Sequence, residues 1–289
     1  MIKVIASDLD GTLLNEHHAF SDKTIKMIKK AQDRGIRFML ATGRSFKQAK
    51  QLTEDAGIEC DYLVSSGAEV RNSKKELILS SHMRMQDCKM VYDVLKDGTI
   101  PFLFSTKECD YCIGTQEELE DNVLEHIFAF SQTVSKEEIK KSPIYKNMMA
   151  KTRVVSDFSA LEILQPKIIK IFIFTNDLTK LAAIKERLIE NKGIAVTSSF
   201  PNNLEVTDIK AQKGPVLKDY IESLGYSMDE VMVFGDSLND YSMLSMDFGA
   251  TIAMENADEA VKIVSKYVTK SNIEDGVAYT IEKLLEHQS

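Results

Sequence analysis

The chain has 289 residues, a formal net charge of −8 and a pI of about 5.3. This acidic balance excludes a general electrostatic attraction for nucleic acid or anionic lipid, so any phosphate-binding site has to be local. A hydrophobic fraction of 44% and a charged fraction of 28% are ordinary globular values, and the length suffices for one large domain or two moderate ones.

The N-terminal apolar run ends at Asp8 after a few residues, which is too short for the apolar region of a signal peptide. No stretch approaches the roughly 18 consecutive apolar residues that cross a bilayer. We therefore expect a cytoplasmic protein with no membrane partner. Cys109 and Cys112 have no second ligand pair nearby for a zinc site, so reduced, incidental thiols are expected.

The first part of the chain alternates strand-like and helix-like segments. In chain order we expect a strand at 4–7, a helix capped by Ser21 and closed by Gly35, a strand at 36–40, a helix at 46–56 that stops at Gly57, and a strand at 62–64. This order predicts right-handed βαβ units in an α/β core.

The same alternation returns near the C-terminus, where the remaining strands would complete the sheet. We expect a helix at 215–224, a strand at 231–234, a helix at 240–246, strands at 250–253 and 267–268, and a helix at 277–285. Between the two parts, helices at 86–96 and 179–191 mix with strands at 102–104, 168–174, 195–197 and 204–206. This mixture predicts an α+β domain at 83–208, inserted into a core of 1–82 and 209–289.

Asp8 and Asp10 stand where the first strand ends, and the carboxyl ends of parallel strands are where ligands bind in open sheets. Their i, i+2 spacing puts both carboxylates on one side of an extended segment. One carboxylate can then attack while the other transfers protons, and a hard cation such as Mg²⁺ is needed to bring a phosphate dianion near them. The alternative is a strand-to-turn cap rich in Asp and Gly.

Two more strand ends carry polar groups. Asp236, Asn239 and Asp240 follow the strand at 231–234 and suit an oxygen-ligand metal site, or else an Asp/Asn turn that caps a helix. Thr42 and Gly43 offer a hydroxyl and free N–H groups at a helix start, which suits phosphate, or else only a helix cap.

Lys213 supplies a cation for the same edge of the sheet. Pro215 follows closely, and proline is favoured at the first position of a helix, so Lys213 is expected at a helix entrance. There the positive end of the helix dipole also favours an anion. Lys210 lies three residues earlier and is interpreted as a solvated surface charge.

These pieces, in this order, resemble the haloacid dehalogenase-like (HAD) hydrolase superfamily and its Cof-type branch of sugar-phosphate phosphatases. The resemblance spans nearly the whole chain and includes the runs Ser66-Gly67-Ala68, 253–257 and 272–277. Ser66 departs from the Asn that the branch usually has before Gly-Ala. The resemblance implies a doubly wound, Rossmann-like parallel-sheet core with a large inserted cap domain.

The resemblance also implies roles for individual residues. Asp8 becomes the nucleophile that forms an aspartyl-phosphate, and Asp10 becomes the general acid and then base. The implied ligands of Mg²⁺ are the Asp8 carboxylate, the Asp10 main-chain carbonyl and Asp236. The implied phosphoryl ligands are Thr42, the N–H groups of Leu9 and Gly43, Lys213 and Asn239. Asp240 and Arg44 are implied to lie behind these groups. There Asp240 would orient Lys213 or a water on the metal.

The expected partner is therefore a small organic phosphate ester. Asp10 argues against a dehalogenase of the same superfamily, since a phosphate leaving group needs a proton donor there. A phosphosugar mutase uses the same two aspartates and stays an alternative, as does a non-catalytic module that binds phosphometabolites. The five histidines show no ligand spacing and are interpreted as surface residues.

Overall fold

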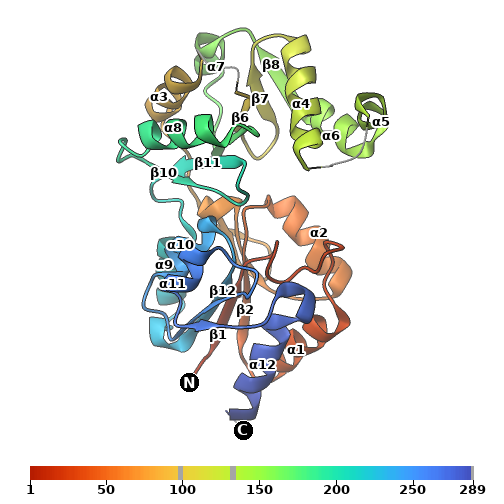
Figure 1. Ribbon diagram of the computed structural model, residues 1–289. Coiled ribbons are helices and arrows are strands. Elements are labelled where there is room, and N and C mark those ends of the chain that lie inside the picture. Colours follow the sequence, from red (N-terminus) through yellow and green to blue (C-terminus); the bar gives the residue numbers. More distant parts are fainter. Residues whose placement is uncertain (97–99, 131–134, 288–289) are drawn as a thin grey trace. The chain divides into compact units, whose positions relative to one another are not determined.

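The computed structural model describes residues 1–96, 100–130 and 135–287 (Figure 1). The chain forms two compact units, one made of Met1–Ser81 and Lys210–Ser289 and the other of His82–Ile209. The second unit thus interrupts the first along the sequence. Among the described residues, no helix combines the length and the apolar character needed to span a membrane.

The first unit is built on an eight-stranded sheet. Its strands are β1 (Val4–Ser7), β2 (Arg37–Ala41), β3 (Asp61–Val64), β4 (Glu69–Arg71), β5 (Leu77–Ser80), β12 (Val231–Gly235), β13 (Ala250–Ala253) and β14 (Tyr267–Val268). The order across the sheet is β14-β13-β12-β1-β2-β3-β4-β5. All pairs from β14 to β3 are parallel, and β4 and β5 add an antiparallel edge. The predicted α/β, doubly wound core is confirmed.

The helices of this unit are α1 (Asp22–Asp33), α2 (Phe46–Ala56), α9 (Lys213–Ser223), α10 (Tyr241–Leu244), α11 (Glu259–Val264) and α12 (Gly276–His287). Local chemistry sets several of their ends. The Ser21 hydroxyl accepts the N–H of Thr24 at 3.0 Å and starts α1. Gly57 ends α2 in the left-handed conformation, with φ at +62°.

The second unit holds a six-stranded, mostly antiparallel sheet in the order β10-β11-β9-β6-β7-β8. Its strands are β6 (Phe102–Ser105), β7 (Asp110–Ile113), β8 (Thr152–Val155), β9 (Lys170–Phe174), β10 (Ile194–Thr197) and β11 (Asn203–Asp208). Its helices are α3 (Met85–Leu95), α4 (Gln116–Phe130), α5 (Lys136–Lys141), α6 (Pro143–Lys151), α7 (Phe158–Leu164) and α8 (Leu178–Leu188). This combination is the α+β architecture that the sequence predicted.

Several predicted helices have different bounds, and two of them lie next to the predicted site residues. Helix α9 begins at Lys213 and not at Pro215. Pro215 fits inside the first turn, because the N–H groups of that turn have no intrahelical acceptor and proline lacks only this group. The helix predicted at 240–246 is reduced to α10, which a short 3₁₀ turn over Leu238–Asp240 precedes. The sequence reading also missed α4 to α7 and the β4–β5 hairpin.

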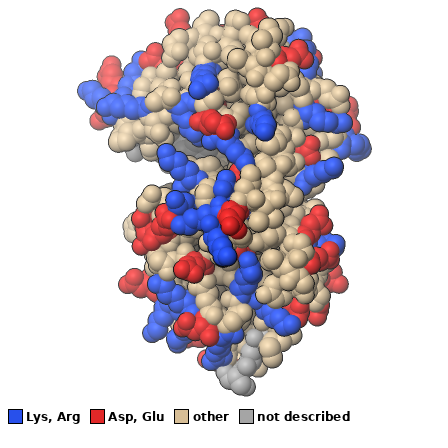
Figure 2. Space-filling view, turned by 180° about the vertical axis from the view of Figure 1, so that it is seen from behind, with Lys and Arg blue, Asp and Glu red and all other residues tan. Residues whose placement is uncertain are grey.

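The cysteines are free and buried in both units: Cys60, Cys88, Cys109 and Cys112. Burial raises the pKa of the Cys60 and Cys88 thiols to about 12, so these two stay protonated near neutral pH. On the face shown in Figure 2, basic and acidic side chains occur on both units, and neither sign alone covers either unit.

Candidate active site

Strand pairing brings the two acidic strand ends together. Strand β1 pairs in parallel with β12, and Ser7 lies opposite Phe234 at the last pair of the ladder. The N–H of Asp8 then donates to the carbonyl of Phe234 at 3.0 Å. As a result, Asp8 and Asp236 leave the sheet at the same carboxyl edge.

Lys213 connects this edge to α9. Its Nζ lies 2.6 Å from Asp8 Oδ1 and 2.7 Å from Asp240 Oδ1, and 3.5 Å from the side-chain oxygen of Asn239. The side chain of Lys213 is 0% exposed and that of Asp8 is 6% exposed. The three charges therefore form a buried cluster with little solvent screening.

Asp236 is fixed by two hydroxyl groups. Thr12 Oγ1 donates to Asp236 Oδ1 at 2.7 Å, and Ser237 Oγ donates to Oδ2 at 2.8 Å. Gly11 has φ at +75°, and a Cβ there would lie 2.4 Å from Asp236 Oδ2. Only glycine allows both this backbone conformation and this approach.

Three carboxylates of this cluster have the chemistry of a cation site. Asp8, Asp236 and Asp240 each offer one oxygen, and the three oxygens lie within 4.8 Å of one another. Carboxylate oxygens are the ligands that Mg²⁺ prefers, so the residues present fit this metal. Asp240 is already occupied, because it accepts from Lys213 and, through Oδ2, from the N–H groups of Asp236 and Ser237 at 2.9 and 3.1 Å.

Burial and close packing shift the pKa values of the acidic side chains in this cluster. Burial, and then the neighbouring Asp240, raise the pKa of Asp236 to about 7, against the lowering effect of its hydroxyl donors. Burial raises the pKa of Asp8 as well, and Lys213 opposes this shift. Burial alone would lower the pKa of Lys213, but Asp240 and Asp8 outweigh it and raise that pKa, so the lysine stays charged.

Asp10 is held apart from this buried cluster. Arg44 binds its carboxylate with two hydrogen bonds, from Nε to Oδ2 at 2.7 Å and from a terminal nitrogen to Oδ1 at 2.5 Å. The side chain of Asp10 is 35% exposed. A partly exposed, oriented carboxylate next to the nucleophile candidate Asp8 is suited to exchange protons with a ligand or with water.

The turn at 65–67 connects residues 42–44 to the start of α9. The N–H of Ser66 donates to the Thr42 carbonyl at 3.1 Å, and that of Ser65 donates to the Arg44 carbonyl at 2.9 Å. A Cβ at Gly67 would lie 2.9 Å from the Gln212 backbone, directly before Lys213.

The remaining predicted residues are placed as follows. Leu9 is a buried core residue, so only its main chain can serve a ligand. Thr42 is buried, and its hydroxyl oxygen accepts the N–H of Arg44 at 3.1 Å. Direct contacts thus join Lys213 to Asp8, Asn239 and Asp240.

Sequence reasoning missed the residues that hold the loop after the nucleophile candidate. Asn256 donates to the Gly11 carbonyl at 2.8 Å, and Asn272 donates to the Leu14 carbonyl at 2.7 Å. The Ser21 hydroxyl donates to Asp275 at 2.5 Å. The runs 253–257 and 272–277 pointed to these residues, but their partners lie about 250 positions away and had no sequence signal.

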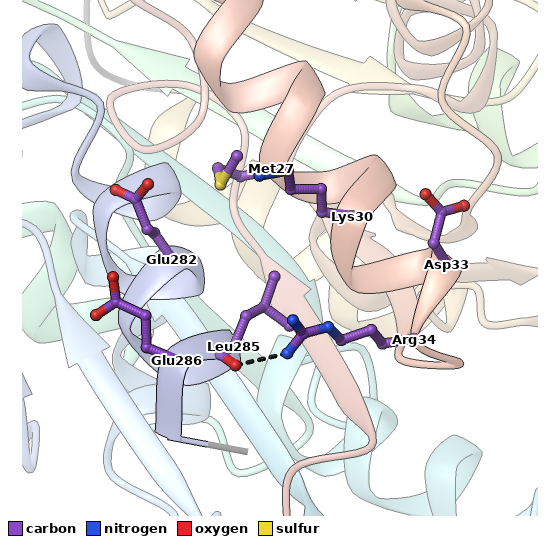
Figure 3. Close-up of a pocket in the computed structure, with 7 residues that line it drawn as sticks. All are labelled: Met27, Lys30, Asp33, Arg34, Glu282, Leu285 and Glu286. Atoms are coloured by element: carbon purple, nitrogen blue, oxygen red, sulfur yellow. Dashed lines mark hydrogen bonds between the residues drawn. The ribbon is translucent and has the colours of Figure 1, made fainter. Parts of the chain in front are cut away.

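A surface groove lies between α1 and α12, with a volume of about 370 Å³ (Figure 3). It is lined by Met27, Lys30, Asp33, Arg34, Glu282, Leu285 and Glu286. Arg34 donates to the Leu285 carbonyl at 2.5 Å across it. None of the predicted site residues lines this groove, and its mixed charges suit helix packing better than a phosphate.

Known proteins resemble this chain along nearly its whole length. Two 5-amino-6-(5-phospho-D-ribitylamino)uracil phosphatases of Bacillus subtilis, YcsE and YwtE, are 29% and 30% identical to it. The alignments cover 97% and 99% of this chain and 94% and 99% of those proteins. A solved haloacid dehalogenase-like hydrolase from B. subtilis superposes with a TM-score of 0.80 at 27% identity, covering 97% of this chain and 99% of that one.

The sequence profile of the haloacid dehalogenase-like hydrolases matches residues 5–281. That range contains every residue of the carboxylate and lysine cluster as well as the whole second unit. The chain therefore belongs to the haloacid dehalogenase-like hydrolase family and is a phosphatase.

Proposed function

We propose that this phosphatase uses Mg²⁺ and Asp8 to hydrolyse small organic phosphate monoesters through an aspartyl-phosphate. The observation that carries the proposal is the buried contact of Asp8 with Lys213 at the end of β1. A carboxylate held there has a fixed cation beside it, which can stabilise the charge of a phosphoryl group in transfer.

In the first step an oxygen of Asp8 attacks phosphorus and the bond from phosphorus to the ester oxygen breaks. Asp10 gives its proton to the departing oxygen, which leaves as an alcohol. In the second step Asp10 takes a proton from water, the water oxygen attacks phosphorus, and Asp8 is released with inorganic phosphate. The exposure of the Asp10 side chain supports this exchange with incoming molecules.

Lys213, Asn239, Thr42 and the main-chain N–H groups of Leu9 and Gly43 would hold the phosphoryl oxygens. Asp8, the main-chain carbonyl of Asp10 and Asp236 would hold Mg²⁺, which supplies charge neutralisation between the carboxylate and the phosphate dianion. Asp240 would orient Lys213, consistent with its 2.7 Å contact. Arg44 would orient Asp10 through its two hydrogen bonds.

The names of two relatives support a choice of substrate class. Two of them are named for a substrate whose phosphate sits on a ribityl chain, which is a hydroxylated alkyl chain. We therefore favour sugar or polyol phosphates as substrates of this chain.

Metal dependence is the first test. A chelator should abolish hydrolysis of para-nitrophenyl phosphate, and Mg²⁺ should restore it. Full activity in chelator would contradict the mechanism.

A second test addresses the covalent step. Asp8→Asn should lose all turnover, and mass spectrometry after an acid quench should find phosphate on the wild-type peptide that contains residue 8 but not on the variant. Turnover in Asp8→Asn at the wild-type rate would rule out covalent catalysis through this residue.

A further inference from the structure

A tight hairpin follows Asp8 and Asp10 in the chain and brings one histidine close to Asp10. Residues 14–20 form the hairpin, with a bridge between Leu14 and Phe20. His18 lies at its tip, and its Nδ1 is 4.0 Å from Asp10 Oδ1. The Arg44 guanidinium binds the same carboxylate. Asp10 therefore has neighbours from two separate segments of the chain, His18 and Arg44.

The hydrogen bonds described below form the hairpin, and none of them uses the His18 imidazole. The side-chain oxygen of Asn15 accepts the N–H groups of His17 and Ala19 at 3.0 and 3.2 Å. The main chains of Asn15 and His18 add a further hydrogen bond at 3.0 Å. His18 has φ at +54°, a conformation that asparagine or glycine would supply as well. The turn therefore does not explain why a histidine stands here.

Packing does not explain the ring either, since 78% of the His18 side chain is exposed. The hairpin itself is anchored on both sides, by Asn272 at the Leu14 carbonyl and by Asp275 at Ser21. The base of the hairpin is therefore anchored near Asp10. An exposed side chain on an anchored turn beside a reacting group is suited to ligand contact.

We propose that His18 is a specificity-determining residue that contacts the alcohol part of the phosphate ester beside Asp10. This inference rests on the proposed function. A general acid lies about 2.6–3.2 Å from the oxygen that it protonates, so the ester oxygen has to come that close to Asp10. The carbon chain attached to that oxygen then lies within reach of an imidazole 4.0 Å from the same carboxylate.

The chemistry of the surroundings selects the class of alcohol. Four carboxylates, those of Asp8, Asp10, Asp236 and Asp240, stand against the cations Lys213 and Arg44. The two charges of Mg²⁺ would be offset by those of the phosphoryl dianion, so this balance does not favour a second anionic group on the leaving alcohol. The ring nitrogens of an imidazole form hydrogen bonds, which matches hydroxyl groups. We therefore assign His18 to a hydroxylated leaving group, as in sugar and polyol phosphates.

The test compares two substrates on His18→Gly, a variant that tolerates a positive φ and leaves no side-chain donor or acceptor. One substrate is a pentitol phosphate, and the other is para-nitrophenyl phosphate, which has no hydroxyl groups. The ratio of kcat/KM for the pentitol phosphate over the aryl phosphate should fall about tenfold, mainly through KM, as loss of one hydrogen bond implies. His17→Gly is the matched control, because His17 is 80% exposed and pairs with Glu16, and its ratio should not change.

The other possible results of this experiment would each contradict a specific claim. An equal loss on both substrates would mean that His18 acts on Asp10 or on the hairpin, and an unchanged ratio would mean that it does not touch the alcohol. Either result removes this inference and leaves the proposed function standing. Wild-type protein that hydrolyses no phosphate monoester with Mg²⁺ would remove both.

Discussion

Lys213 Nζ and Asp8 Oδ1 lie 2.6 Å apart, although 205 positions separate the two residues in the sequence. The lysine ammonium has no contact with solvent, and its second carboxylate partner is Asp240. The two carboxylates hold the ammonium beside Asp8. We propose that Lys213 acts there as a countercharge for an anion that arrives at Asp8.

Replacement of this countercharge should slow the reaction strongly. Lys213→Ala should lower kcat/KM on one substrate by the equivalent of about 2–4 kcal/mol in transition-state stabilisation. Lys210→Ala is the matched control, because Lys210 is exposed and should stay close to wild type. Circular dichroism should first show that both variants are folded. If Lys210→Ala were the impaired variant, the role given to Lys213 would be wrong.

The proton transfer assigned to Asp10 predicts a dependence on the leaving group. Asp10→Asn keeps the main-chain carbonyl but cannot donate a proton. The loss of kcat should be largest for alkyl phosphates, whose alcohols are poor leaving groups, and smallest for para-nitrophenyl phosphate. A series of aryl and alkyl phosphates measures this as a steeper dependence of log kcat on the pKa of the alcohol. Equal losses along the series would contradict a proton donor at this position.

Metal removal and pH should be coupled through Asp236. Its pKa rises from 3.8 to about 7 in the folded, metal-free protein, so between these values the folded state holds a proton that the unfolded chain has released. Stability without metal is therefore greater at the acidic end and falls as the pH rises through this range. Mg²⁺ binds the ionised form, so its effect on Tm should be larger at about pH 8 than at about pH 5.

Thermal melts of wild type and Asp236→Asn, with Mg²⁺ and with chelator, would measure this coupling. The variant should show a flatter dependence of Tm on pH and a smaller gain from Mg²⁺. A wild-type gain from Mg²⁺ that is the same at both pH values would contradict the shifted pKa of Asp236.

The turn that joins Thr42 to α9 should tolerate no side chain at Gly67. Gly67 has φ at +100°, and an added Cβ would lie 2.9 Å from the Gln212 backbone. Gly225 is the matched control, since its φ is +86° and no atom lies within 4 Å of a Cβ there. Gly225→Ala should cost about 1–2 kcal/mol of unfolding free energy, and Gly67→Ala about 1–3 kcal/mol more.

Denaturant unfolding of the two variants tests this difference. Gly67→Ala should also lower kcat/KM, because Gln212 leads directly into Lys213, whereas Gly225→Ala should keep it. Equal stability losses in the two variants would show that the backbone contact at Gly67 relaxes freely.

The sequence predicted the elements whose ends carry a local signal. Helix α2 has the predicted bounds because Gly57 ends it. Helix α4 was missed, although Leu119, Val123 and Ile127 recur at helical spacing and pack together in the second unit. Asp8, Asp236 and Asp240 do meet, since the parallel strands β1 and β12 bring their carboxyl ends to one edge, and Lys213 reaches Asp8 and Asp240 from the start of α9. The contact of His18 with Asp10 could not be predicted, because it depends on the geometry of one turn.

The pairing of β1 with both β2 and β12 has a consequence for synthesis on the ribosome. Strand β1 emerges first, but one of its edges stays unpaired until residues 231–235 have been made. The second unit is contiguous in sequence and can form during that interval. The nascent chain thus carries Asp8 through most of translation without Lys213 or Asp236. If these residues have the proposed roles, phosphatase activity is expected only after residue 236 has been made.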